Sequence, residues 1–215
     1  MLDKPEMLKV TEAAVVSGVD IRDVNRAFDE GILQNFSTPD EGRRFSTAAC
    51  MVIRFYFGSA KRLTSDERLF AIESLGPRLR RLNPDAFGTF LEEDWVVRDE
   101  FLTIDMAPFL KATAERMERL AAARAVVTTS REVLGGTPVI TGTRVPVHDV
   151  AASHAAGYSR EDILSAYPSL TSEQIDLAVL YAEANPVRGR PRAASQPAGA
   201  TLVSERRVPR RPRAE

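Results

Sequence analysis

The chain has 215 residues, 44% of them apolar, with 29 Lys and Arg against 30 Asp and Glu, which suits one or two globular domains. It has no run of about 18 apolar residues to span a membrane, and its first residues lack the basic and apolar segments of a signal peptide. Cys50 has no second cysteine to pair with. We therefore expect a cytoplasmic protein without an internal disulfide or a membrane partner.

The small net charge of −1 conceals a strong asymmetry. From residue 186 to the end there are eight arginines and two glutamates, a net charge of +6, which leaves −7 on residues 1–185. A basic end on an acidic body indicates a polyanionic or acidic partner for that end.

Two short helices are predicted near the N-terminus, Glu12–Ser17 and Ile21–Glu30. Thr11 and Asp20 are their expected N-caps, and each helix is followed by a glycine. A small residue, a turn glycine and a buried β-branched residue are spaced as in a helix-turn-helix. They are Ala14, Gly18 and Val24.

The second helix presents arginine and asparagine outward, and these side chains read guanine and adenine in the major groove. Ile32–Phe36 and Arg43–Ser46 flank a turn at Pro39–Gly42 and predict a wing, and a third helix follows through Tyr56. Residues 1–60 thus resemble the winged helix-turn-helix of MerR and excisionase proteins. The candidate DNA-binding residues are Thr11, Arg22, Asn25, Arg26, Arg43 and Arg44.

The charge of this first region opposes tight DNA binding by a single copy. Residues 1–60 carry seven basic and nine acidic side chains, whereas DNA affinity depends largely on neutralising phosphates. A homodimer that places two recognition helices on half-sites about 34 Å apart would compensate. The alternative is a helix-turn-helix used only for protein contact.

Residues 61–125 predict a helix from Thr64 that breaks at Gly76-Pro77, and then a hairpin of Trp95–Arg98 with Phe101–Ile104. A long helix capped by Asp105 is expected to reach Arg124. We interpret this middle region as a spacer or dimerisation element. A ligand pocket around the two aromatic residues of the hairpin is the alternative.

The region 126–185 begins with the glycine- and proline-rich segment Gly135–Val147. Its Thr-Gly-Thr tip lies between two short apolar pieces and predicts a tight β-hairpin. The alternative interpretation is a phosphate-binding loop. Such a loop needs a helix N-terminus directly after its glycines, and here Pro-Val-Ile follows instead. Three helices are expected next, at His148–Ala156, Ser159–Tyr167 and Thr171–Asn185.

One pattern in this region resembles a known family. It reads Gly135-Gly136-x-Pro138-Val139-Ile140-x-Gly142-Thr143-Arg144-Val145-Pro146-Val147, followed by Ala156-Gly157, Tyr167-Pro168-Ser169-Leu170-Thr171 and Tyr181-Ala182. This pattern is similar to the VapB-type antitoxin domain, catalogued as DUF433. The resemblance implies a small helical antitoxin module whose partner is a PIN-type (PIN-domain) ribonuclease toxin.

The last helix of the module carries two apolar stripes, and one suffices for its own core. The second suggests a protein partner, either another copy or the toxin. DNA is disfavoured because residues 159–185 hold five acids and one base. The candidate toxin-binding residues are Ile175, Val179 and Tyr181 in the helix and Arg188, Arg190, Arg192, Arg206 and Arg207 beyond it.

Residues 186–215 contain five prolines and predict a disordered basic tail. Arg188-Gly189-Arg190-Pro191 matches the core of an AT-hook, which enters a narrow A·T minor groove. The antitoxin resemblance offers a second interpretation, in which the arginines enter the toxin's metal-binding carboxylate pocket. The sequence alone favours the second.

No catalytic constellation is evident. Two histidines and Cys50 do not form a recognisable zinc site, and no nucleophile-elbow, Walker or Rossmann motif occurs. We therefore expect a non-enzyme without metal or cofactor. A hydrolase with an unrecognised site is a distant alternative.

The expected fold class is mainly α with small β-hairpins: a winged helix-turn-helix, a three-helix antitoxin domain and a tail. The leading function is a type II antitoxin that blocks its toxin and represses its own operon by binding operator DNA. It acts as a homodimer or in a larger toxin–antitoxin assembly. The alternative is a stand-alone MerR-like regulator whose C-terminal half senses a ligand or partner.

Overall fold

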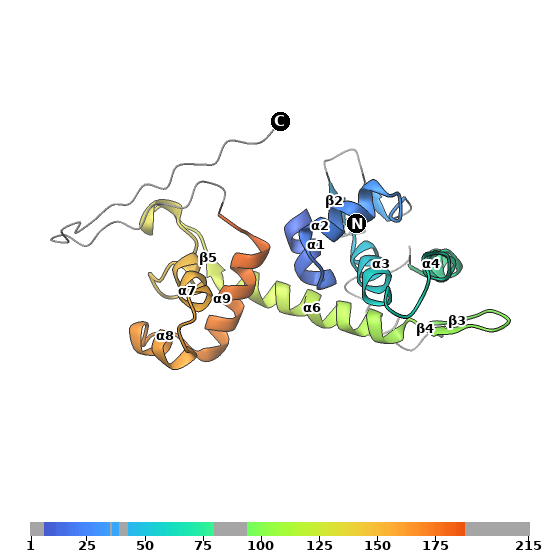
Figure 1. Ribbon diagram of the computed structural model, residues 1–215. Helices are drawn as coiled ribbons and strands as arrows, with labels where there is room; N and C mark the ends of the chain where they lie inside the picture. The colour runs from blue at the N-terminus through green and yellow to red at the C-terminus, as the bar shows by residue number, and fades with distance from the viewer. Residues whose placement is uncertain (1–6, 35, 39–42, 80–93, 188–215) are drawn as a thin grey trace, which may run out of the picture.

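The computed structural model describes residues 7–34, 36–38, 43–79 and 94–187. The described chain is mainly helical and contains small two-stranded antiparallel sheets. A long helix, α6, runs between an N-terminal group of helices and a C-terminal group (Figure 1). The expected wing turn at residues 39–42 and the tail arginines from Arg188 onward lie outside the described residues.

The N-terminal group begins with two short helices, α1 (Val10–Ser17) and α2 (Ile21–Asp29). Gly18 takes φ +66° in the turn between them, a left-handed conformation that glycine adopts without a steric penalty. Its N–H donates to the carbonyl of Ala14 at 2.8 Å and so closes α1. Val24 of α2 is fully buried. The sequence spacing therefore produces two helices joined by a three-residue turn, as predicted.

A small hairpin and a third helix follow. Strands β1 (Ser37–Thr38) and β2 (Arg44–Phe45) pair antiparallel, with Ser37 opposite Phe45. Helix α3 (Thr47–Gly58) is capped by Ser46, whose Oγ accepts the N–H of Ala49 at 3.1 Å. The same hydroxyl donates to the carbonyl of Phe36 at 3.0 Å and joins the hairpin to the helix.

The middle region forms α4 (Ser65–Leu79), the hairpin of β3 (Val96–Arg98) and β4 (Thr103–Asp105), and α6 (Ala107–Ala125). The predicted break at Gly76-Pro77 is wrong, because α4 continues through the proline to Leu79. The predicted hairpin and long helix are confirmed. Trp95 is buried, whereas Phe101 at the hairpin tip is 97% exposed, so the two aromatic residues do not line a common pocket.

One hydrophobic core joins the first region to the middle region. It contains side chains from Leu8 to Leu120, including Phe45 and Phe55 from the first 60 residues and Trp95 and Leu110 from the middle region. Residues that the sequence divided between two regions therefore share a single interior.

The C-terminal group contains β5 (Val127–Thr128), a 3₁₀ turn (Leu134–Gly136), β6 (Val139–Ile140), α7 (Val147–Ala155), α8 (Arg160–Ala166) and α9 (Ser172–Ala184). Its three helices match the predicted ones within one residue or so at each end. Ser159 and Thr171, the first residues of the predicted ranges, cap α8 and α9: their hydroxyl oxygens accept the N–H groups of Asp162 and Gln174, each at 3.1 Å.

The pairing of β6 differs from the prediction. The expected hairpin between residues 139–140 and 145–147 survives as a single bridge of Val139 with Pro146 and as the bond from Ile140 N–H to Val145 O at 3.0 Å. The main partner of β6 is β5, which follows α6 directly. The sequence did not predict β5, which precedes the Gly135–Val147 segment. A strand of two residues is too short to show an alternating pattern of apolar and polar side chains.

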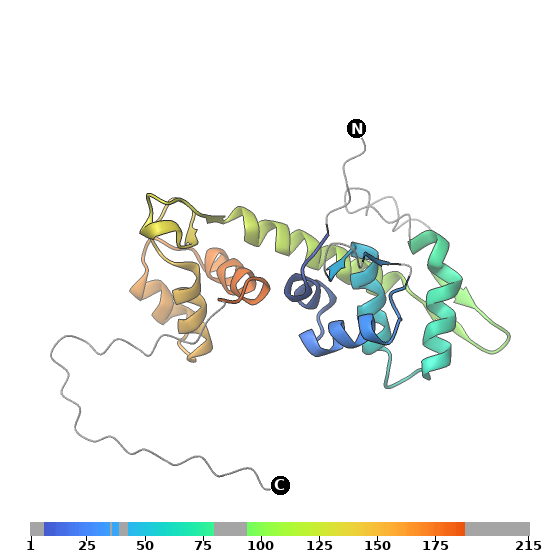
Figure 2. The same cartoon turned by 90° about the horizontal axis from the view of Figure 1, so that it is seen from above.

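Helix α9 lies between the two groups. Ile175 and Ala178 belong to the core of the C-terminal group, whereas Ala184 at the end of the same helix belongs to the N-terminal core. Figure 2, seen from above, shows α9 beside α1 and alongside α6. The second apolar stripe of α9 is thus largely covered by this chain's own helices.

Candidate nucleic-acid interface

The outward face of α2 carries the arginines on which DNA binding was predicted to depend. Arg22 is exposed and makes no hydrogen bond or ion pair with any residue that the structure describes. Arg26 is also exposed, but its Nε lies 2.7 Å from Oε1 of Glu30. That carboxylate raises the pKa of Arg26, mainly by its hydrogen bond and also by its charge. Arg22 is therefore the readily available bidentate donor on this face.

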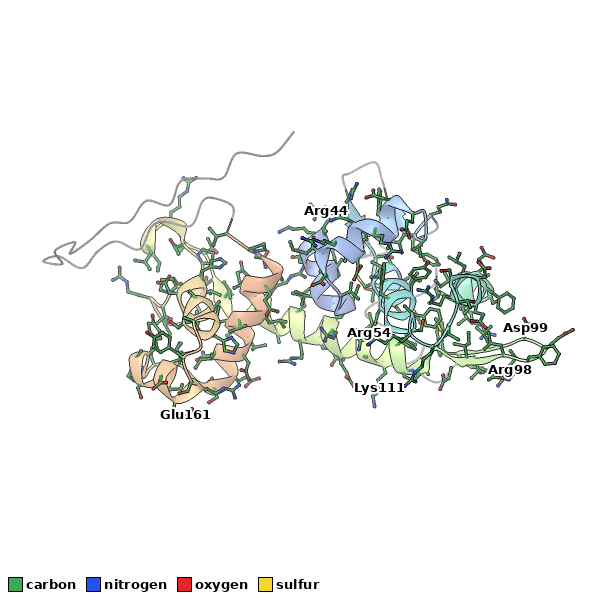
Figure 3. The ribbon with its side chains drawn as sticks, in the orientation of Figure 1. Arg44, Arg54, Arg98, Asp99, Lys111 and Glu161 are labelled. Atoms are coloured by element: carbon green, nitrogen blue, oxygen red, sulfur yellow. The ribbon has the colours of Figure 1, made fainter. Side chains whose placement is uncertain are left out.

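Arg43 connects the hairpin to α2. One guanidinium nitrogen donates to Oδ1 of Asn25 at 2.6 Å, and another lies 2.8 Å from Oδ1 of Asp29. The guanidinium carbon also lies 4.9 Å from the centre of the Phe28 ring. Arg43 therefore holds the hairpin against the helix. Its neighbour Arg44, labelled at the top of the N-terminal group in Figure 3, forms no ion pair with any acid that the structure describes.

The same network engages Asn25. Its Nδ2 donates to the carbonyl of Ile21 at 2.9 Å, while its Oδ1 accepts from Arg43. Both ends of the amide thus have intramolecular partners, and adenine could be bound only by exchanging them. The sequence identified Asn25 and Arg43 as DNA contacts, whereas the structure places them in a clamp between hairpin and helix.

We expect Arg43→Ala to loosen this clamp. It removes two charge-assisted hydrogen bonds and a stacked cation, so the free energy of unfolding should fall by about 1–2 kcal/mol, and less if solvent screens the half-exposed pair. Urea denaturation followed by circular dichroism measures this change. Arg44→Ala, at the adjacent position in the same hairpin, is the matched control and should leave stability nearly unchanged. Equal stability of both variants would contradict the clamp.

Thr11 does not cap α1, contrary to the prediction. The helix begins at Val10, because the carboxylate of Glu12 accepts the N–H of Lys9 at 2.9 Å and moves the start upstream. Thr11 lies in the first turn, and its hydroxyl donates to the carbonyl of Ala184 at 2.6 Å. Its role in the structure is to join α1 to the end of α9.

Three further polar side chains hold α1 in place, and no sequence pattern indicated them. Glu12, almost fully buried, forms an ion pair with Arg124 of α6 at 2.9 Å. Arg54 and Arg116 donate to the carbonyls of Ser17 and Val15 at 3.1 and 2.8 Å. Burial and the neighbouring Arg116 lower the pKa of Arg54. Their partners are two backbone carbonyls and one distant arginine, which no sequence spacing reveals.

Gly18 has a second reason to be glycine. A Cβ built at this position would lie 2.8 Å from a guanidinium nitrogen of Arg54 and 3.0 Å from the guanidinium carbon of Arg116. The turn between α1 and α2 is therefore positioned by the two arginines that close the C-terminal end of α1.

The predicted toxin-binding residues of α9 occupy different environments. Ile175 is 1% exposed and belongs to the module's core. Val179 and Tyr181 are half-buried, and the Tyr181 ring lies 6.5 Å from that of His148. Of these three predicted residues, only Val179 and Tyr181 have surface to offer a partner.

The potential metal-ligating side chains in the described part of the chain do not cluster. No group of three or more His, Cys, Asp or Glu there is placed to hold a metal ion. Burial raises the pKa of the Cys50 thiol to about 12, so the thiolate is scarce at neutral pH. Within the described ranges, no helix is both long enough and apolar enough to cross a bilayer.

A known protein family matches the C-terminal group of helices and strands. Residues 127–182, from β5 to near the end of α9, match the family described as "Protein of unknown function (DUF433)". The molecule is thus a mainly helical protein that carries a DUF433 domain at its C-terminal side.

The whole chain is also similar to a bacterial protein. It is 57% identical over 208 residues to "Uncharacterized protein y4eO" of Sinorhizobium fredii (strain NBRC 101917 / NGR234), and the match covers 96% of this chain and 94% of that protein. The chain therefore belongs to the y4eO family. No solved structure matches it significantly.

Proposed function

We propose that the chain is a DNA-binding antitoxin that represses its own operon and holds a PIN-type ribonuclease toxin in an inactive complex. The observation that carries the DNA-binding part is the order of α1, a three-residue turn, α2, the β1–β2 hairpin and α3. This order resembles that of a winged helix-turn-helix of the MerR type, and it supports a proposal in which α2 is the recognition helix and the hairpin is the wing.

The side chains on this face support the proposal. Arg22 is free to reach a base edge, and Arg44 lies on the hairpin where a wing meets phosphates. Arg26 engages an exposed carboxylate, and exposed i,i+4 pairs are weak, so DNA phosphates can displace Glu30. These three arginines are the DNA contacts of the proposal, and a homodimer would double them.

The toxin-binding part is supported by the resemblance of residues 126–185 to the VapB-type domain, in the same segment that matches DUF433. The module exposes acidic side chains from α8 and α9, including Glu161 and Glu173. Phosphates would repel such a surface, whereas a basic protein surface would be attracted to it. Val179 and Tyr181 provide the adjoining apolar contact.

Two measurements test the two halves separately. The full chain is incubated with a random-sequence duplex library, and bound DNA is amplified over several rounds; enrichment of one sequence class is the expected result. The chain is also co-expressed with the product of the neighbouring gene and purified by a tag on one partner. We expect copurification of a small nuclease and rescue of growth.

The outcomes distinguish the alternatives. Enrichment of a DNA sequence without any copurifying nuclease would leave the stand-alone regulator as the function. Copurification without DNA enrichment would leave a helix-turn-helix that serves only protein contact. Failure of both would reject the proposal.

A further inference from the structure

The β3–β4 hairpin carries an aromatic side chain that no part of the described chain covers. Phe101 lies at the tip of the hairpin and is 97% exposed, whereas Trp95 and Val97 near its base are buried. In Figures 1 and 2 the hairpin projects beyond α4 at one end of the molecule. The ring of Phe101 therefore contributes nothing to the core of its own chain and is open to contact by a second molecule.

The turn at the tip holds this ring in a fixed place. Asp99 and Leu102 exchange two backbone hydrogen bonds, with N–H to carbonyl distances of 2.8 and 3.3 Å. These bonds close a two-residue turn of Glu100 and Phe101. A carboxylate oxygen of Asp99 also accepts the N–H of Glu100 at 2.9 Å. An aromatic side chain on such a preorganised turn loses little conformational freedom on binding, so Phe101 is suited to anchor an interface.

A cavity that can receive an aromatic ring lies at the same end of the molecule. It has a volume of about 170 Å³ and lies between the loop after α2 and helix α4. Its walls are mainly apolar and include Ile32, Phe36, Leu69 and Ile72, and the exposed side chain of Glu73 lies at its edge. An apolar cavity of about 150 Å³ is large enough to bind benzene. The cavity therefore has the size and the lining that one phenylalanine ring requires.

One rotation brings each ring to a cavity. Both views place α4 between α2 and the tip of the hairpin (Figures 1 and 2), so the cavity and the tip lie on either side of α4. A two-fold axis midway between them exchanges the two points, and the tip of each copy then meets the cavity of the other. Such an axis passes close to α4, whose Phe70 is 40% exposed. Ring, cavity and Phe70 thus form one self-complementary surface.

We propose that two copies of this chain form a two-fold dimer in which Phe101 of each copy occupies the cavity between α2 and α4 of the other. Phe70 of each copy lies near the axis, where the two α4 helices face each other. The inference goes beyond the proposed function, because the dimer needs neither operator DNA nor a toxin.

The charges around the ring favour a protein partner of this kind. Asp99 and Glu100 precede Phe101 at the tip, so DNA phosphates would be repelled there. Arg98, next to Asp99 in Figure 3, pairs with Asp94 at 2.9 Å, and this ion pair is exposed and easily exchanged. In the dimer, the carboxylate of Glu73 at the edge of the cavity provides a partner of opposite charge for Arg98.

Sedimentation equilibrium of the full chain over a range of concentrations tests the dimer. We expect the parent chain to dimerise and Phe101→Asp to raise the dissociation constant of the dimer by about 10-fold or more. Tyr158→Asp replaces an aromatic residue of the C-terminal group that is 61% exposed, and it should leave the constant unchanged. Both variants should keep the circular dichroism spectrum of the parent chain, because both side chains are exposed.

A mixture of two defective variants tests the contact between ring and cavity itself. Phe101→Asp lacks the ring but keeps the cavity, whereas Glu73→Trp places a bulky side chain over the cavity but keeps the ring. Each variant alone should be mainly monomeric, because both of its contacts are defective. In the mixture, one intact ring meets one intact cavity, so heterodimers should form and copurify through different tags on the two variants.

Several results would overturn the inference. The parent chain would remain a monomer at every concentration, or Phe101→Asp would leave the dimer intact. Two variants that dissociate but do not complement each other would reject the ring-to-cavity contact. Assemblies that keep growing with concentration would show that the contact does not close into a pair. An intact dimer of Phe101→Asp that no longer copurifies with the nuclease would assign the ring to the toxin.

Discussion

Replacing Arg22 by alanine should weaken binding to the selected duplex by about 5- to 150-fold, or about 1–3 kcal/mol. Arg22 is the α2 arginine without a partner among the described residues, so its guanidinium can bind a guanine edge without breaking an ion pair. The loss should be concentrated at one base pair of the site, where other bases would then be tolerated. Competition with single-base variants of the duplex, followed by anisotropy, measures both effects.

Two controls separate base reading from charge. Arg22→Lys keeps the charge but lacks the planar fork, so the salt dependence should persist while the preference for guanine is lost. Lys111→Ala removes an exposed cation of α6 on the side of the molecule opposite Arg44 (Figure 3) and should leave binding unchanged. If Arg22→Ala and Lys111→Ala behaved alike, α2 would not be the recognition helix.

The second large effect concerns the C-terminal module. Ile175→Ala should lower the free energy of unfolding by about 2–5 kcal/mol, because it leaves a cavity where a fully buried side chain packs against Val147, Val150 and Ile163. The module's core is small, so this loss is a large share of its stability. Thermal and urea unfolding followed by circular dichroism measure it.

Val179→Ala is the control on the same helix. Its side chain is half-buried, so the free energy of unfolding should fall by about 1 kcal/mol or less. The variant should therefore stay folded, whereas the amount of nuclease that copurifies with it should fall clearly. If Ile175→Ala were as stable as the parent chain and lost only the nuclease, Ile175 would be a contact residue and the core assignment would fail.

Local chemistry was sufficient to predict the helices. Gly18, Ser159 and Thr171 have fixed preferences for turns and caps, and these preferences act over three or four residues whatever the rest of the chain does. The errors have equally local causes. Pro77 was expected to end α4, but it lies near the C-terminal end of the helix, where few turns remain to be disrupted.

The roles of the arginines could not be predicted in this way. Arg43 and Arg44 are neighbours in sequence, yet Arg43 is held by Asn25 and Asp29, while Arg44 is partly exposed and pairs with no acid that the structure describes. Arg54 and Arg116 reach the carbonyls at the end of α1 from two other helices. A long side chain takes its partner from whatever the fold brings near it, and sequence spacing contains that information only within one helix or hairpin.

By itself the sequence determined the helical class, the position of the turns, the segment that matches DUF433 and the charge of each part, because these follow from side-chain preferences and composition. The tertiary structure alone decided that α9 ends against α1, that its second apolar stripe is covered by the chain's own helices, and that Asn25 and Arg43 hold each other. Each of these depends on contacts between residues far apart in the chain, up to 173 positions for Thr11 and Ala184, which form only when the hydrophobic core brings the helices together.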